Sequence, residues 1–180
     1  MQKDADIEEK RVGEGSFVIS AGSVIEDAWK KLLADLTVEP IFIDNKPATA
    51  KKISMPRIAL VETSFHDMDA GWTRFVFDTY KIPFKVVKPG DFSKTDFASS
   101  YDVVIFPSSS KSILMSGKYG SAGSYYVSSY APQFTKGIGA EGMKKMMAFV
   151  DAGGTTISWG SSTALFEGTL SILDEKTRSR

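Results

Sequence analysis

The sequence contains no cysteine and only one histidine among its 180 residues. Without cysteine the chain can form no disulfide, hold no metal through a thiolate and use no cysteine nucleophile, although this absence fits either redox compartment. The single histidine, His66, has no second imidazole beside it, so the sequence predicts no metal site in this chain.

Long apolar runs and an excess of one charge are also missing. No run approaches the roughly 20 apolar residues needed to cross a bilayer, so we expect no membrane span. The 22 basic and 22 acidic residues balance each other, which gives no indication of a nucleic-acid partner. A glycine-rich phosphate motif does not follow any predicted strand, because the nearest such stretch, residues 137–142, precedes a helix without a strand before it.

Composition divides the chain into four segments. Residues 1–12 are predicted to be a disordered or added leader, residues 13–54 a strand–helix–strand segment with a linker, residues 55–172 an α/β domain, and residues 173–180 a charged tail. The apolar content of 42% is enough for a real core, so we expect residues 13–172 to form one compact unit.

The segment before residue 55 carries one strong helical pattern. Apolar residues at spacings of three and four predict a helix over residues 25–36, with Trp29 as a core anchor. Residues 16–20 and 38–43 are rich in β-branched and aromatic residues and predict short strands, the second irregular because it contains Pro40.

The stretch from Met55 to Lys88 predicts a βαβ unit. Residues 58–61 are apolar without alternation, which is typical of a strand buried on both faces of a parallel sheet. A helix then begins near residue 68, Pro83 ends it, and residues 84–87 form the next strand. Five apolar side chains share one side of this helix: Met68, Trp72, Phe75, Val76 and Tyr80.

Further strands are predicted at residues 102–106 and 155–158, with a helix over residues 141–152 between them. Strands that alternate with helices predict an α/β three-layer sandwich with a mostly parallel sheet. Residues 107–137, rich in serine and tyrosine, are predicted to be a long loop, either a functional lid or a mobile excursion.

A turn of small residues follows the strand at residues 155–158 and leads into a helix. This order is the geometry of a nucleophile elbow. A serine hydrolase would use Ser161 or Ser162 there, with His66 as its base, because both loops lie at the carboxyl edge of a parallel sheet. An orienting acid is available near His66: Glu62, Asp67 or Asp69.

Residues 56–60 (PRIAL) and 68–74 (MDAGWTR) resemble a pattern found in the C-terminal part of certain bacterial zinc carboxypeptidases of the carboxypeptidase A-like class. Three other stretches agree with the resemblance, which spans about residues 13 to 170: residues 15–19, residues 101–105, and residues 137–139 through 149–154. In those proteins this region is similar to a class I glutamine amidotransferase domain, an α/β sandwich related to flavodoxin-like folds, and follows the peptidase domain.

The resemblance implies that the chain keeps the amidotransferase fold but lacks the residues that catalyse the reaction. Active amidotransferases use a cysteine on the elbow with a later histidine and glutamate, whereas this chain has Gly160 and Ser161 there and no histidine after them. The zinc of the family belongs to the upstream peptidase domain, so we expect no cofactor in this chain. The implied function is a non-catalytic accessory domain of a secreted, extracytoplasmic zinc carboxypeptidase. That domain would serve in interaction with the upstream peptidase domain or in substrate positioning.

A ligand pocket at the sheet edge is the remaining expectation. It would take a peptide or a small carboxylate, with Arg74 pairing with the carboxylate, although a structural salt bridge is the other use open to Arg74. A nucleotide or flavin at the switch point of the sheet is an alternative ligand. The residues expected to line the pocket are Ser64, His66, Arg74, Ser108, Ser109, Lys111, Gly160 and Ser161.

Overall fold

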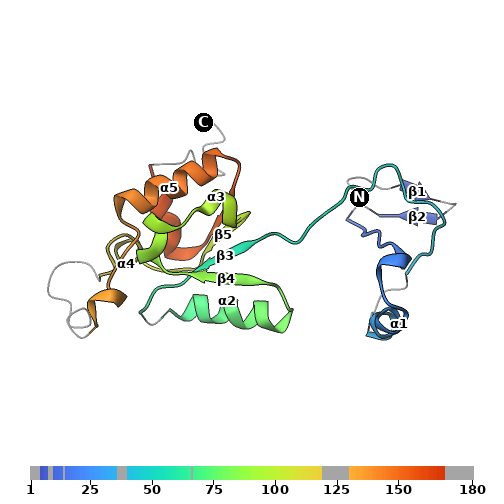
Figure 1. The fold of residues 1–180 in the computed structure, drawn as a ribbon, viewed down its shortest axis with the longest axis horizontal. Helices are drawn as coiled ribbons and strands as arrows, with labels where there is room; N and C mark the ends of the chain where they lie inside the picture. Colours follow the sequence, from blue (N-terminus) through green and yellow to red (C-terminus); the bar gives the residue numbers. More distant parts are fainter. Residues whose placement is uncertain are drawn as a thin grey trace. The chain divides into compact units, whose positions relative to one another are not determined.

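A computed structural model describes residues 5–7, 10–13, 15–35, 40–65, 67–118 and 130–168 of the chain. The chain divides into two units, residues 1–54 and residues 55–180, which are described separately (Figure 1). The division falls between the predicted strand–helix–strand segment and the predicted α/β domain. The single unit expected over residues 13–172 stays a prediction.

The first unit contains a hairpin and a helix. Strands β1 (Ala5–Ile7) and β2 (Lys10–Val12) pair antiparallel, within the segment expected to be a disordered leader. Helix α1 (Glu26–Asp35) confirms the predicted helix, and a 3-10 turn, η1 (Ala21–Ser23), precedes it. The strand predicted at residues 16–20 is wrong, because these residues have no regular structure. Residues 40–43 of the second predicted strand are also irregular, and residues 36–39 lie outside the described part.

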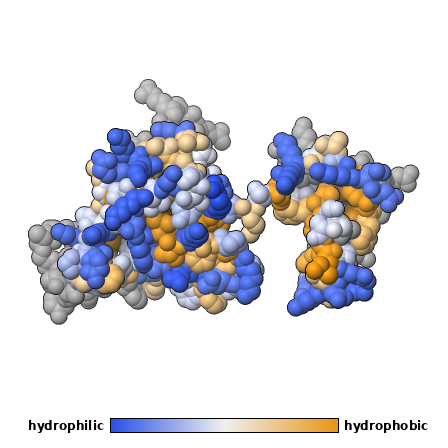
Figure 2. Space-filling model, viewed as in Figure 1, coloured by the Kyte–Doolittle hydropathy of each residue, from blue (hydrophilic) through white to orange (hydrophobic). Residues whose placement is uncertain are grey.

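None of the apolar side chains described in this unit is fully buried. No residue of α1 is buried, and Ile25 just before it is 79% exposed. Trp29 is half-buried, so the prediction that it anchors a core is wrong. A unit of this size has little interior in which a tryptophan can be enclosed. Figure 2 shows apolar residues at the visible surface of both units.

The second unit is built on a four-stranded parallel sheet, as the sequence predicted. Its strands are β3 (Ile58–Val61), β4 (Phe84–Val87), β5 (Val103–Phe106) and β6 (Thr155–Ser158), in the order β4-β3-β5-β6. The fold class is therefore α/β, consistent with a flavodoxin-like three-layer sandwich. The chain first adds β4 on one side of β3 and then adds β5 on its other side, so the strand order reverses between β3 and β5. That reversal is the switch point at which such sheets bind ligands.

Helices flank both faces of the sheet (Figure 1). Helix α2 (Met68–Thr79) connects β3 to β4 on one side. On the other side lie α3 (Phe97–Ser100), α4 (Lys111–Ser116) and α5 (Gly139–Asp151), together with the 3-10 segments η2 (Pro89–Lys94) and η5 (Gly160–Phe166). One further 3-10 segment is η4 (Pro132–Phe134). Across the described ranges, no helix combines the length and apolar character that crossing a bilayer requires.

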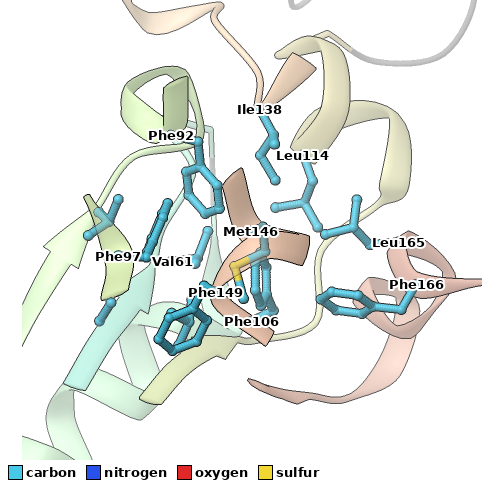
Figure 3. Packing of buried hydrophobic residues seen from close by; sticks show 13 residues of the cluster. Val61, Phe92, Phe97, Phe106, Leu114, Ile138, Met146, Phe149, Leu165 and Phe166 are labelled. Atoms are coloured by element: carbon cyan, nitrogen blue, oxygen red, sulfur yellow. The ribbon is translucent and has the colours of Figure 1, made fainter. Parts of the chain in front are cut away.

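Two apolar clusters follow from the alternation of side chains along the strands. On the α2 side, Ile58, Leu60 and Ile105 pack with Phe77. On the other side lies the larger cluster, which Figure 3 shows around Phe106. Its fully buried members include Ala59, Phe92, Val104, Phe106 and Met146.

The starts of β3 and β5 are joined by one ion pair. The backbone N–H of Arg57 and its Nε both donate to Oδ2 of Asp102, at 2.8 and 3.1 Å, and its Nη2 donates to Oδ1 at 2.8 Å. These hydrogen bonds lower the pKa of Asp102 to about 2. The pair thus holds the amino-terminal edge of the sheet together, opposite to the edge where ligands are expected.

Candidate functional site

Four loops meet at the carboxyl edge of the sheet, because all four strands run in the same direction. They begin after β3 at residue 62, after β4 at residue 88, after β5 at residue 107 and after β6 at residue 159. The nominated residues that the structure describes lie in the loops after β3, β5 and β6 or in the first two turns of the helical segments that follow these loops. Their geometry decides which of these residues come together.

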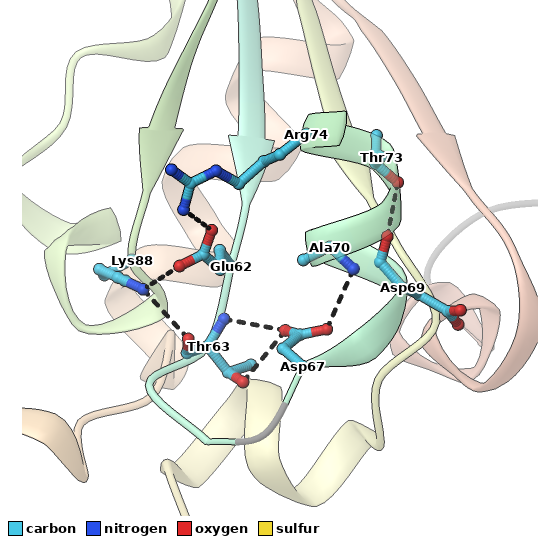
Figure 4. Close-up of polar contacts among 8 residues, drawn as sticks. All are labelled: Glu62, Thr63, Asp67, Asp69, Ala70, Thr73, Arg74 and Lys88. Carbon is cyan, nitrogen blue, oxygen red and sulfur yellow. Dashed lines mark hydrogen bonds and ion pairs between the residues drawn. The ribbon is translucent and has the colours of Figure 1, made fainter. Parts of the chain in front are cut away.

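The loop after β3 is held by Asp67, the N-cap of α2. Its Oδ2 accepts hydrogen bonds from the backbone N–H and the hydroxyl of Thr63, at 3.0 and 3.1 Å, and its Oδ1 accepts from the N–H of Ala70 at 3.3 Å (Figure 4). A carboxylate at this position satisfies free amides of the first helical turn. Asp67, one of the acids considered for a triad, therefore stabilises the entry to α2.

Glu62 pairs with two cations at the end of β3. Nη1 of Arg74 lies 3.0 Å from Oε2, and Nζ of Lys88 lies 2.7 Å from Oε1 and 3.1 Å from the carbonyl oxygen of Thr63 (Figure 4). Burial opposes the charge of Glu62, but Lys88 and Arg74 outweigh it, so the pKa of Glu62 lies below its ordinary value. Arg74 thus makes the structural salt bridge, the second of the uses open to it.

The third acid considered for a triad, Asp69, lies in the first turn of α2, where its carbonyl accepts from the hydroxyl of Thr73 at 2.7 Å. His66 lies outside the described residues. The pairing of His66 with a serine after β6 therefore stays a prediction.

The turn after β6 has the shape of an elbow but no room for a side chain at its apex. Gly160 has φ +59°, a left-handed conformation that favours glycine. A Cβ built on Gly160 would overlap Oγ of Ser108 and lie 2.6 Å from the Cβ of Ser108. The Ser108 hydroxyl is itself held there, because it accepts the N–H of Ser161 at 3.1 Å. The space in which an elbow carries its nucleophile is therefore filled by Ser108.

The two elbow serines differ in their surroundings. Ser162 is fully buried, and its hydroxyl lies 2.9 Å from the carbonyl oxygen of Phe106 and 2.8 Å from that of Trp159. These contacts tie the turn to the end of β5. Ser161 is exposed. Of the two, only Ser161 presents its side chain to solvent.

A cavity of about 300 Å³ opens between the loops after β3 and β4 and the segment at residues 133–136. Three lysines and one carboxylate line it, Lys88, Lys94, Lys136 and Asp91. Lys88 pairs with Glu62, whereas Lys94 and Lys136 are exposed and make no ion pair with any described residue. We call this cavity the lysine pocket; its other polar linings are Thr63, Ser64 and Gln133.

Among the nominated residues that the structure describes, Ser64 is the one that lines the lysine pocket. Three other nominated residues lie together at the elbow: Ser108, Gly160 and Ser161. Ser109, the next residue after Ser108, is half-buried, and Lys111, the first residue of α4, is exposed. The sequence does indicate one residue of this pocket. Lys88 directly follows a predicted strand, so it is expected at the carboxyl edge of the sheet. Within the ranges that the structure describes, no group of three or more histidine, aspartate or glutamate side chains could hold a metal ion.

No family model matches the chain, and no curated protein or solved structure matches it. The α/β fold class is therefore established by the structure itself. A relation to zinc carboxypeptidases stays a prediction from the sequence stretches that carry the resemblance.

Proposed function

We propose that residues 55–172 form a non-catalytic, amidotransferase-like accessory domain of a secreted zinc carboxypeptidase. In this proposal zinc and peptidase chemistry reside in the upstream peptidase domain of the same protein, which is also the partner of this domain. The accessory domain contributes domain interaction or substrate positioning, and it needs no cofactor of its own.

The observation that carries the proposal is the apex of the elbow. Acyl-transfer chemistry of the amidotransferase kind needs a nucleophile that forms a covalent intermediate, with a base beside it. Gly160 supplies no nucleophile, and the position of Ser108 leaves no space for one. The hydroxyl of Ser162 is buried against backbone carbonyls. The scaffold supports a binding role better than a catalytic one.

The lysine pocket supports a carboxylate as the ligand. Lys94 and Lys136 line the pocket with positive charge, and the hydroxyl of Ser64 supplies a hydrogen-bond donor. A carboxylate accepts hydrogen bonds from both kinds of donor, and charge-assisted hydrogen bonds are the stronger kind. The chain end of a peptide carries such a group, which fits an accessory role beside a carboxypeptidase.

The absence of catalysis is tested with the full chain and a fluorophosphonate probe, together with assays for ester hydrolysis and for ammonia release from glutamine. We expect no labelling and no turnover, because glycine occupies the apex of the elbow and the hydroxyl of Ser162 is buried. Labelling that disappears in Ser161→Ala would overturn the proposal and establish the serine hydrolase instead. An unrelated serine hydrolase in the same reaction serves as the positive control.

Carboxylate binding is tested by NMR titration of the full chain with a short peptide that has a free carboxyl end and with the same peptide amidated. We expect only the free acid to shift signals around the pocket. Lys94→Gln and Lys136→Gln should each weaken binding about fivefold, the loss expected for one partly exposed charge pair. Lys85→Gln, an exposed lysine outside the pocket, is the matched control and should bind normally. Equal binding of acid and amide would contradict the carboxylate.

A further inference from the structure

Helix α2 turns its large apolar side chains away from the sheet that it covers. Ala70 is fully buried, and Phe77 packs against the cluster on β3 and β5, so these two mark the inner side of the helix. The outer side carries the five apolar residues that the sequence placed on one stripe, and each of them is between 43% and 73% exposed. We call these five the α2 stripe: Met68, Trp72, Phe75, Val76 and Tyr80.

This arrangement reverses the usual pattern, in which a surface helix buries its apolar face and exposes its polar one. Three aromatic rings that are about two-thirds exposed, with a methionine and a valine, amount to roughly 600 Å² of apolar surface. Apolar patches of that size lie at the upper limit for a monomer and mark interaction sites. The α2 stripe therefore has the size of an interface.

The stripe also contains a hollow. Gly71 lies between Met68, Trp72 and Phe75, and together with Asp67 these residues line a depression of about 410 Å³. A Cβ built on Gly71 would meet no atom within 4 Å. Next to the hollow, the rings of Trp72 and Phe75 pack edge to face, with their centroids 5.9 Å apart. Exposed rings and an open depression lie side by side on the same surface.

We propose that a second copy of this chain packs its α2 stripe against the first, antiparallel about a two-fold axis. A two-fold axis requires a surface that is complementary to itself. The stripe meets this requirement, since the ring of Phe75 from each copy can enter the hollow at Gly71 of the other. Two stripes would bury about 1,200 Å², the lower bound for specific interfaces.

The charges at the two ends of α2 favour the antiparallel orientation. Asp69 lies in the first turn of the helix and Lys81 lies just beyond its end. In an antiparallel pair each Asp69 approaches the Lys81 of the other copy, and the helix dipoles are opposed. A parallel pair would instead place like charges next to each other, which is destabilising.

Sedimentation equilibrium of the full chain between 1 and about 200 μM, the range in which interfaces of this size associate, tests the proposal. We expect the apparent mass to rise with protein concentration from 19.7 kDa toward twice that value, the mass of a dimer. Trp72→Glu and Phe75→Glu should each raise the dimer dissociation constant at least about 30-fold, the effect of losing a central aromatic residue. Far-ultraviolet circular dichroism establishes that each variant is folded. Two variants are used so that misfolding of one leaves the other to decide.

Ile25→Glu is the matched control, because it places the same charge on an exposed apolar residue of the first unit. It should leave the dimer intact. Asp69→Lys and Lys81→Asp should each weaken the dimer, and the double variant should restore it. A monomer throughout the concentration range would overturn the proposal, as would a dimer that Ile25→Glu dissociates. Failure of this experiment would leave the lysine pocket and the elbow unaffected.

Discussion

Replacing Gly160 by alanine is expected to lower the free energy of unfolding of the α/β unit by about 3 kcal/mol. A left-handed backbone costs an ordinary residue about 1 kcal/mol, and overpacking against a fixed neighbour adds about 2 kcal/mol. Both apply here, because φ is +59° and the new Cβ would overlap Ser108. Denaturation of the full chain in urea, followed by near-ultraviolet circular dichroism, measures the loss.

Gly153→Ala separates the two causes. Gly153 also has a positive φ, +91°, but a Cβ there would meet no atom within 4 Å. We therefore expect this control to cost only about 1 kcal/mol, the backbone contribution alone. Adding Ser108→Gly to Gly160→Ala should recover part of the loss, because it removes both atoms with which the new Cβ collides. Equal losses for the two alanine variants would mean that the elbow has room for a side chain.

That comparison bears on function as well as on stability. If Ser108 closes the apex, a nucleophile cannot be restored there by a single substitution, and the scaffold is committed to binding. If the apex accepts a side chain without cost, the proposal of a non-catalytic domain loses its main support. The stability measurement thus tests the proposed function without needing a substrate.

The sheet could be predicted from the sequence because its two central strands, β3 and β5, are buried apolar runs with clear boundaries. Residues 58–61 and 84–87 were predicted with the bounds that the structure has, and both parallel pairing and fold class followed from the βαβ pattern. The strand predicted at residues 16–20 failed for the opposite reason. Its residues favour an extended chain, but no described strand pairs with them, and strand propensity depends on such a partner.

Only the location of the site, at the carboxyl edge of the sheet, could be predicted from the sequence. Topology places the loops after the strands on one side of the sheet, but the lysine pocket also needs Lys136, which is far away in sequence. Lys136 reaches the pocket because two backbone segments pack closely at Gly117 and Gly137, where no side chain lies between them. The N–H of Ile138 also donates to the carbonyl of Leu114 at 2.8 Å. Such a long-range approach leaves no periodic pattern in the sequence.

The outward-facing stripe on α2 shows a related limit. The sequence correctly placed Met68, Trp72, Phe75, Val76 and Tyr80 on one side of the helix. Periodicity identifies the apolar side of a helix but not which surface covers it. The sheet is instead covered by the side that carries Ala70 and Phe77.

Replacing Phe106 by alanine is expected to cost about 4 kcal/mol of stability, the usual loss when a fully buried ring leaves a cavity. Phe106 ends β5 in the centre of the larger cluster, with ring centroids 5.9 Å from Phe92 and 5.4 Å from Phe166. Its carbonyl also accepts the hydroxyl of Ser162 at 2.9 Å. The residue therefore joins the core to the elbow, so the substitution should loosen both.

Phe134→Ala is the matched control, because the same ring is removed from a side chain that is about half exposed, and it should cost about 1 kcal/mol or less. Urea denaturation gives both values, and amide hydrogen exchange at Ser161 reports on the elbow. We expect the N–H of Ser161 to exchange faster in Phe106→Ala but not in Phe134→Ala. The N–H of Ser161 is held by the hydroxyl of Ser108, which lies two residues after Phe106. A large stability loss without faster exchange at Ser161 would mean that the elbow is held by Ser108 independently of the core.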